Sequence, residues 1–93
     1  MDGRPAAINA ALTRLLREAR KQRGVSMDEL ARRAGVHRTY VGLLEREERQ
    51  PTVAAAAALA EALDLCFSEV LAEAERQVEA DGGATAPESG VSG

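Results

Sequence analysis

The stretch from 27 to 46, MDELARRAGVHRTYVGLLER, constrains this chain most, because two short helical patterns meet there at one glycine. Gly35 can take a positive φ at low steric cost, so it ends the first helix and turns the chain. Ala31 precedes it on the inner face, and Val41 and Leu44 follow at helical spacing. A small crossing residue, a turn glycine and two apolar anchors predict a helix-turn-helix at about 27–46, in preference to an ordinary helical hairpin.

Composition predicts an all-α class for the whole chain. Ninety-three residues with one Tyr, one Phe and no Trp form one small domain whose core is built from Leu, Val, Ile and Ala. No stretch alternates apolar and polar residues as a half-buried strand would. A core of this size is marginal, so dimerisation would stabilise it.

The helices expected before the turn glycine have recognisable ends. Pro5 suits the first turn of a helix, and Gly24 suits its C-terminal cap. The apolar face of this first helix comprises Ile8, Leu12, Leu15, Leu16 and Ala19. Ser26 and Glu29 form a capping box, which starts the second helix at about Met27. The third helix should start near Arg38, with His37 at the cap position, and run to Glu45 or Arg46.

The second part of the chain predicts two more helices and a tail. Thr52 can cap a fourth helix at 53–63, and Cys66 or Ser68 opens a fifth. The apolar stripe of the fifth helix comprises Phe67, Val70, Leu71, Ala74 and Val78. Residues 1–80 therefore form a helix-turn-helix domain with extended first and fifth helices. Residues 81–93, DGGATAPESGVSG, are expected to be a disordered acidic tail rich in Gly, Ser and Pro.

Charge is unevenly distributed along the chain. Residues 1–50 hold 11 Lys/Arg and 7 Asp/Glu, a balance of +4, whereas residues 51–93 hold 1 and 8, a balance of −7. A phosphate-facing surface is therefore compatible with the overall charge of −3. Solvated helix faces and an acidic tail would account for the tail equally well.

Several functional classes find no support in the sequence. Cys66 is the one cysteine, so no internal disulfide can form, which fits a reducing cytoplasm. The longest apolar run, 53–60, is too short to span a membrane, and the first residues do not resemble a signal peptide. His37 has no second histidine near it, so no metal site is expected. Without a nucleophile–base pair or a phosphate-binding glycine loop, we expect no enzyme and no cofactor.

From about Leu12 to Leu71 the chain resembles the lambda-repressor/Cro-type helix-turn-helix family, also called XRE-like. The matching segments are LREARKQRGVSMDELARRAGVHRTYV, LLER, QPTV and LAEALDL. The resemblance implies a compact five-helix DNA-binding domain, usually in a homodimeric transcriptional regulator. It also implies that the third helix enters the major groove and that the start of the second helix meets phosphates.

The resemblance assigns roles to particular residues. The expected base contacts are Arg38, Thr39, Gly42 and Leu43. The expected phosphate contacts are Met27, Arg32, Arg33, His37, Tyr40, Arg46 and Arg49. Arg20 and Glu45 resemble the interhelical ion pair of the family. The apolar length of the fifth helix predicts a homodimer interface at Phe67, Val70, Leu71, Ala74 and Val78.

Two functions are consistent with these assignments. The first is a sequence-specific transcriptional regulator of repressor or controller type, which binds an inverted-repeat operator in double-stranded DNA as a homodimer. The alternative is a protein-interaction adaptor or antitoxin-like module with weakened DNA recognition. The alternative draws on departures from the family pattern, namely Met27 for a common glutamine, apolar or absent side chains at Gly42 and Leu43, Glu47 for a glycine, and alanines at 54, 55 and 58 for polar residues.

Overall fold

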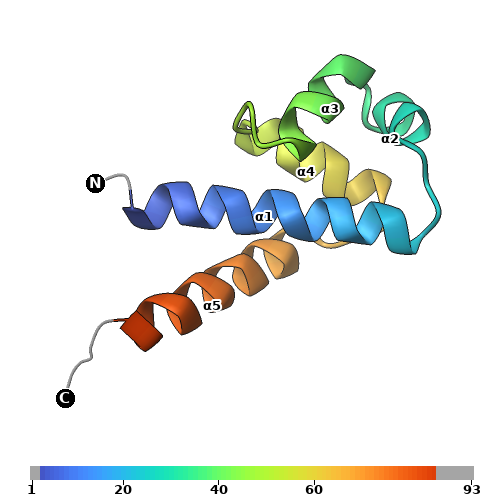
Figure 1. Ribbon diagram of the computed structural model, residues 1–93. Helices are drawn as coiled ribbons and strands as arrows, with labels where there is room; N and C mark the ends of the chain where they lie inside the picture. The colour runs from blue at the N-terminus through green and yellow to red at the C-terminus, as the bar shows by residue number, and fades with distance from the viewer. Residues whose placement is uncertain (1–2, 86–93) are drawn as a thin grey trace.

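Five helices make up the described residues, 3–85, of the computed structural model (Figure 1). Their bounds are α1 Gly3–Gln22, α2 Met27–Ala34, α3 Arg38–Glu45, α4 Val53–Ala62 and α5 Phe67–Thr85. Helix α1 runs through the middle of the molecule, with α2, α3 and α4 on one side and α5 on the other (Figure 1). No strand occurs within residues 3–85, so the all-α prediction is confirmed.

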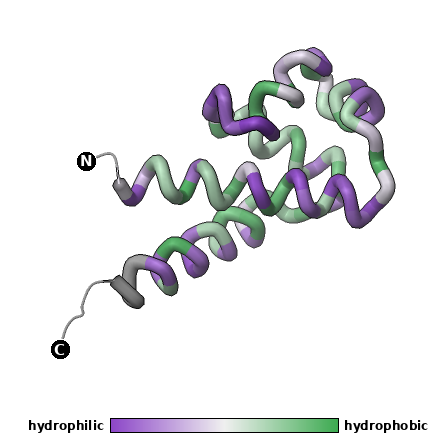
Figure 2. Tube along the Cα trace, in the orientation of Figure 1, coloured by the Kyte–Doolittle hydropathy of each residue, from purple (hydrophilic) through white to green (hydrophobic). Residues whose placement is uncertain are grey.

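The core lies where α1 meets the helices on both sides. Helix α1 packs most extensively on α5, and α2 packs on α3 and α4. The three largest fully buried side chains are Leu30, Val41 and Leu63. Val41 and Leu44 are 1% and 3% exposed, so the two expected anchors of the third helix are confirmed. The segment that follows α3 is hydrophilic, as Figure 2 shows.

Hydroxyl side chains start α2 and α4 as expected. Ser26 Oγ accepts a hydrogen bond from the Glu29 N–H at 3.0 Å, and Thr52 Oγ1 accepts one from the Ala55 N–H at 3.0 Å. The second hydrogen bond of the predicted capping box, from the Ser26 N–H to the Glu29 carboxylate, does not form. The Glu29 carboxylate is turned along the helix to Arg32 and Arg33, because charged donors there compete with the Ser26 N–H.

The first four helices all end in the same backbone turn. A residue one or two positions after each helix adopts a positive φ in the left-handed region, at Gly24 (67°), Gly35 (74°), Glu47 (60°) and Asp64 (60°). After α3, for example, the Glu47 N–H donates to Leu44 O and the Glu48 N–H donates to Leu43 O, both at 2.9 Å. This pair of hydrogen bonds satisfies carbonyls that a helix end would otherwise leave without a partner. Glycine predicts two of these turns, whereas Glu47 and Asp64 carry a Cβ in a strained region.

Helix α5 is longer than the sequence predicts. It continues to Thr85, so residues 81–85 are helical and the expected boundary of the tail is corrected. Val78 packs against the core, and Arg4 Nη2 lies 3.3 Å from Glu79 Oε2, so the contact with α1 supports α5 almost to the former boundary. The rest of the expected tail, 86–93, lies outside the described residues.

One ion pair joins α1 to the end of α3. Arg20 donates through Nε to Glu45 Oε2 at 2.6 Å and through Nη2 to Oε1 at 2.9 Å, and the two side chains are 12% and 14% exposed. The pair expected from the family resemblance is therefore confirmed. The remaining Nη1 of Arg20 donates to Val25 O at 2.9 Å, and Arg17 Nη1 donates to Glu45 O at 2.7 Å. Two arginines thus hold the C-terminal end of α3 against α1.

Removing either partner of this pair should destabilise the domain. Arg20→Ala or Glu45→Ala leaves the other charge poorly compensated in a mostly buried position, so we expect a loss of about 3 kcal/mol in the free energy of unfolding. Denaturant unfolding of both single variants and the double variant measures it. Arg4→Ala, which breaks the exposed pair with Glu79, is the control and should cost less than about 1 kcal/mol. Small and additive effects of Arg20→Ala and Glu45→Ala would contradict the prediction.

The positive φ of Glu47 predicts a stabilising substitution. Glu47→Gly removes the contact between Cβ and backbone that disfavours this conformation, so the free energy of unfolding should rise by about 1 kcal/mol. Glu48→Gly is the matched control, because the same residue change is made at the next position. It should lower stability, since Glu48 is outside the positive-φ positions, glycine there adds freedom to the unfolded chain, and the exposed pair with Arg46 is lost. Equal effects at the two positions in thermal unfolding would refute the assignment of strain.

Candidate nucleic-acid interface

Helix α3 presents its N-terminal end to the surrounding solvent. Arg38 and Thr39 are exposed, whereas Val41 and Leu44 on the opposite face are buried. Residues three and four apart share a helix face, so Val41 and Leu44 are buried together while Arg38 and Thr39 face solvent. Leu43 is half-buried, so part of its side chain is accessible beside Thr39. Three of the four expected base contacts therefore lie at least partly open on one helix.

Gly42, the fourth expected base contact, is buried. A Cβ built on it would lie 3.1 Å from Arg46 Nη1 and 3.9 Å from Arg46 Cζ. The side chain of Arg46 therefore covers this glycine. A direct contact between the Gly42 backbone and a base edge would therefore require this side chain to move.

The expected phosphate contacts fall into two groups. Met27 and Tyr40 are half-buried and pack against the core, so much of each side chain is already used for packing. The exposed group comprises Arg32, Arg33, His37, Arg46 and Arg49. His37 occupies the N-cap of α3 without a side-chain capping bond. We use the name α2–α3 surface for Arg32, Arg33, His37, Arg38, Thr39, Arg46 and Arg49.

Carboxylates pair with four of the arginines on the α2–α3 surface. Arg38 Nε lies 2.7 Å from Asp28 Oδ1, and Arg46 Nε lies 3.2 Å from Glu48 Oε2. Glu29 accepts hydrogen bonds from both Arg32 and Arg33, with 2.8 Å between its Oε2 and Arg33 Nε. The bond from Arg33, aided by the charge of Arg32, holds the pKa of Glu29 below its ordinary value. All four pairs are exposed enough for solvent to compete, so a polyanion can replace the carboxylates.

Comparison with known proteins identifies this arrangement. A family model described as helix-turn-helix matches residues 16–69, which include α2 and α3. The chain belongs to the XRE-type helix-turn-helix family of DNA-binding transcriptional regulators. Control protein C.SmaI of Serratia marcescens is 36% identical over 64 residues, which cover 69% of this chain and 76% of that protein. The HTH-type transcriptional regulator SutR of Escherichia coli is 40% identical over 57 residues, covering 61% of this chain and 32% of SutR. No solved structure gives a significant match.

The helix-turn-helix protein uses its α5 stripe within its own fold. Ala74 is 0% exposed, so it belongs to the core and is corrected as a candidate dimer contact. The other four expected interface residues, Phe67, Val70, Leu71 and Val78, are half-buried and pack against the core. Helix α5 packs chiefly on the extended α1, which accounts for much of the apolar length of α5. Only their remaining exposed area is free to contact a second copy.

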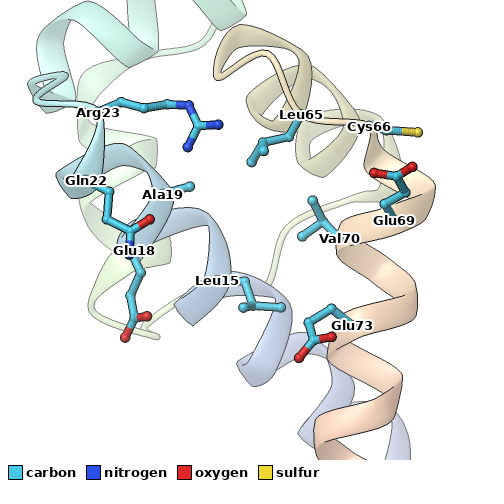
Figure 3. A pocket seen from close by; sticks show the side chains of 10 residues that line it. All are labelled: Leu15, Glu18, Ala19, Gln22, Arg23, Leu65, Cys66, Glu69, Val70 and Glu73. Atoms are coloured by element: carbon cyan, nitrogen blue, oxygen red, sulfur yellow. The ribbon is translucent and has the colours of Figure 1, made fainter.

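A cleft lies between α1 and the start of α5 (Figure 3). Helix α5 is on the other side of α1 from α3 (Figure 1). Its volume is about 320 Å³, and its apolar lining includes Leu15, Leu65 and Val70. Glu18, Glu69 and Glu73 also line it, so the cleft does not suit a phosphate. The Cys66 thiol points away from the other side chains in Figure 3, and its hydrogen bond with Ser68 lowers its pKa.

Residues 3–85 hold no group of three or more His, Cys, Asp or Glu side chains placed to bind a metal ion. Over the same residues no helix combines the length and apolar character needed to cross a bilayer.

The sequence did not identify the carboxylates of the α2–α3 surface as partners of its arginines. Glu29 could have been found, because Arg32 and Arg33 follow it at helical spacings of three and four. Asp28 and Arg38 are on different helices, and only the turn at Gly35 brings them together. The pair of Arg46 and Glu48 depends on the backbone turn at Glu47, which no glycine marks.

Removing the carboxylate of Asp28 should strengthen binding to DNA of any sequence. Asp28→Asn frees Arg38 and removes a negative charge that repels phosphates, so we expect affinity for duplex DNA to rise about two- to fivefold at low salt. Fluorescence anisotropy with a labelled duplex measures the change. Asp64→Asn, in the turn between α4 and α5, makes the same change of charge and retains a residue type that tolerates positive φ. An equal gain in both variants would show an effect of net charge alone.

Proposed function

We propose that this protein is a sequence-specific transcriptional regulator that binds an inverted-repeat operator in double-stranded DNA as a homodimer. The observation that carries the proposal is the exposed N-terminal end of α3, where Arg38 and Thr39 project from a helix anchored by Val41 and Leu44. The fold family binds DNA, and its members among the relatives are named as a control protein and a transcriptional regulator. A cytoplasmic location agrees with this function.

Arg38 supplies the strongest candidate contact with a base. A guanidinium group can donate two hydrogen bonds to O6 and N7 of guanine in the major groove. Thr39 can add a hydrogen bond or a methyl contact, and the open part of Leu43 suits a thymine methyl. Arg32, Arg33 and Arg49 would meet phosphates, which fix the register of the helix without reading sequence.

The homodimer is proposed on general and local grounds. A two-fold operator calls for a two-fold protein, and a small core gains stability from extra buried surface. The half-buried residues of α5 retain some apolar area for such a contact, and Val53 of α4 is 75% exposed. A single monomeric species in sedimentation at high micromolar concentration would contradict this part of the proposal.

A second function is favoured by one observation, the pairing of four surface arginines with carboxylates. A protein-interaction adaptor or antitoxin-like module would use the α2–α3 surface with its arginines paired in this way and would need no phosphates. The two functions differ in the response to salt. DNA binding weakens steeply as salt rises, because phosphate contacts release counterions.

Selection from random duplex DNA tests the proposed function. We expect enrichment of an inverted repeat with a guanine in each half-site. Arg38→Ala should then cost about 1–3 kcal/mol of binding free energy per half-site and relax the preference at that guanine. Arg33→Ala and Arg49→Ala are the controls for phosphate contact, and they should weaken all sequences alike and flatten the dependence on salt. No enrichment by the unaltered protein at low salt would leave the adaptor function as the better account.

A further inference from the structure

Arg46 continues a row of residues along α3. It follows Gly42 by four positions and Arg38 by eight, and one helix face repeats at about this spacing. Arg46 is the residue at the C-cap, directly after the last helical residue, and its φ of −87° and ψ of 3° lie just outside the helical region. A side chain on a helix leans back toward the N-terminus, so that of Arg46 runs over the preceding turn.

The guanidinium of Arg46 occupies the space that a side chain at position 42 would take. Its Nη1 lies 3.1 Å from the position of an ideal Cβ on Gly42, which is closer than ordinary van der Waals contact. Glycine at this position therefore admits the guanidinium to the face of α3. A larger residue would push the guanidinium outward, because both groups cannot occupy the same space.

Glu48 holds the opposite part of the same guanidinium. Its carboxylate lies 3.2 Å from Nε and 3.5 Å from Nη2, which leaves Nη1 on the side of Gly42. The backbone turn at Glu47 places this carboxylate two residues after the arginine. The cation is thus oriented by the protein before any contact with DNA, and its side chain is still 58% exposed.

We propose that Arg46 contacts a base edge in the major groove, in addition to Arg38, and that Gly42 determines this contact by giving its guanidinium room. The ligand is a guanine, whose O6 and N7 accept two hydrogen bonds from one arginine. This inference rests on the proposed DNA-binding function. It assigns to Arg46 a base contact in place of the phosphate contact expected from the sequence. It also explains how a recognition helix without a side chain at position 42 can specify more than one base.

The test uses selection from random duplex DNA and competition binding with three variants, two directed at the proposed contact and one control. Each variant keeps a positive charge at position 46. Arg46→Lys retains the charge but lacks the planar fork for two bonds. Gly42→Leu retains Arg46 but fills the space beneath it. Both should reduce discrimination at one guanine about tenfold, and this guanine should differ from the one affected by Arg38→Ala. Arg76→Lys on α5, outside the α2–α3 surface, is the control and should leave every base preference unchanged.

The outcomes separate this inference from the proposed function. If the unaltered protein enriches an operator, but Arg46→Lys and Gly42→Leu keep its full base preference, Arg46 contacts phosphate only and the inference is wrong. If the unaltered protein enriches no sequence, both the proposed function and the inference fall. Thermal unfolding checks that Gly42→Leu remains folded. If Gly42→Leu unfolds, Arg46→Lys alone decides the question.

Discussion

The contact of Arg20 and Arg17 with Glu45 is the interaction on which the placement of α3 depends. Helix α3 has eight residues, too few to be stable alone in water, so its direction must be imposed from outside. Val41 and Leu44 fix one face of it, but apolar contacts are not directional. The fork of Arg20 on the Glu45 carboxylate, with Arg17 on the Glu45 carbonyl, adds directional bonds at one end. The N-terminal end of α3 is thereby left free to project.

The α2–α3 surface combines cations for DNA with carboxylates that hold them. Glu29, Asp28 and Glu48 each lie within ion-pair distance of an arginine, so these three carboxylates offset part of the positive charge of the unbound surface. Such exposed pairs contribute little to stability, but they restrict the side chains they join. Binding to DNA must exchange each carboxylate for a phosphate or a base. Discrimination between sequences can increase as a result, because a weak set of contacts does not compensate for the exchange.

The predictable parts of the fold follow local rules. Ser26 and Thr52 mark helix starts because their hydroxyls bind a backbone N–H three residues later, and Gly24 and Gly35 mark helix ends because they adopt positive φ. The ends at Glu47 and Asp64 escaped prediction as positive-φ turns, since Glu rarely adopts a positive φ and Asp signals it much less strongly than glycine. The Arg20–Glu45 pair was available only through resemblance to a family. Its two residues are 25 positions apart, and no local pattern connects them.

The candidate site was predicted in its residues but less well in its geometry. Exposed Arg38 and Thr39 follow from helix periodicity, because the buried anchors at Val41 and Leu44 fix the opposite face. The covering of Gly42 depends on the rotamer of Arg46, which periodicity does not specify. Ala74 was misassigned for a related reason. An apolar stripe shows which face of α5 is buried, but not whether α1 or a second copy buries it.

The separation of charge along the chain has a consequence for how the protein meets DNA. The acidic second half includes α5, which lies on the opposite side of α1 from α3 (Figure 1). The phosphates of a duplex repel that side and attract the basic first half, so an approaching molecule experiences a torque as well as a force. Encounters then begin with α3 already turned toward the groove. The acidic helix in this way acts on the rate of productive collision, although it touches no nucleotide.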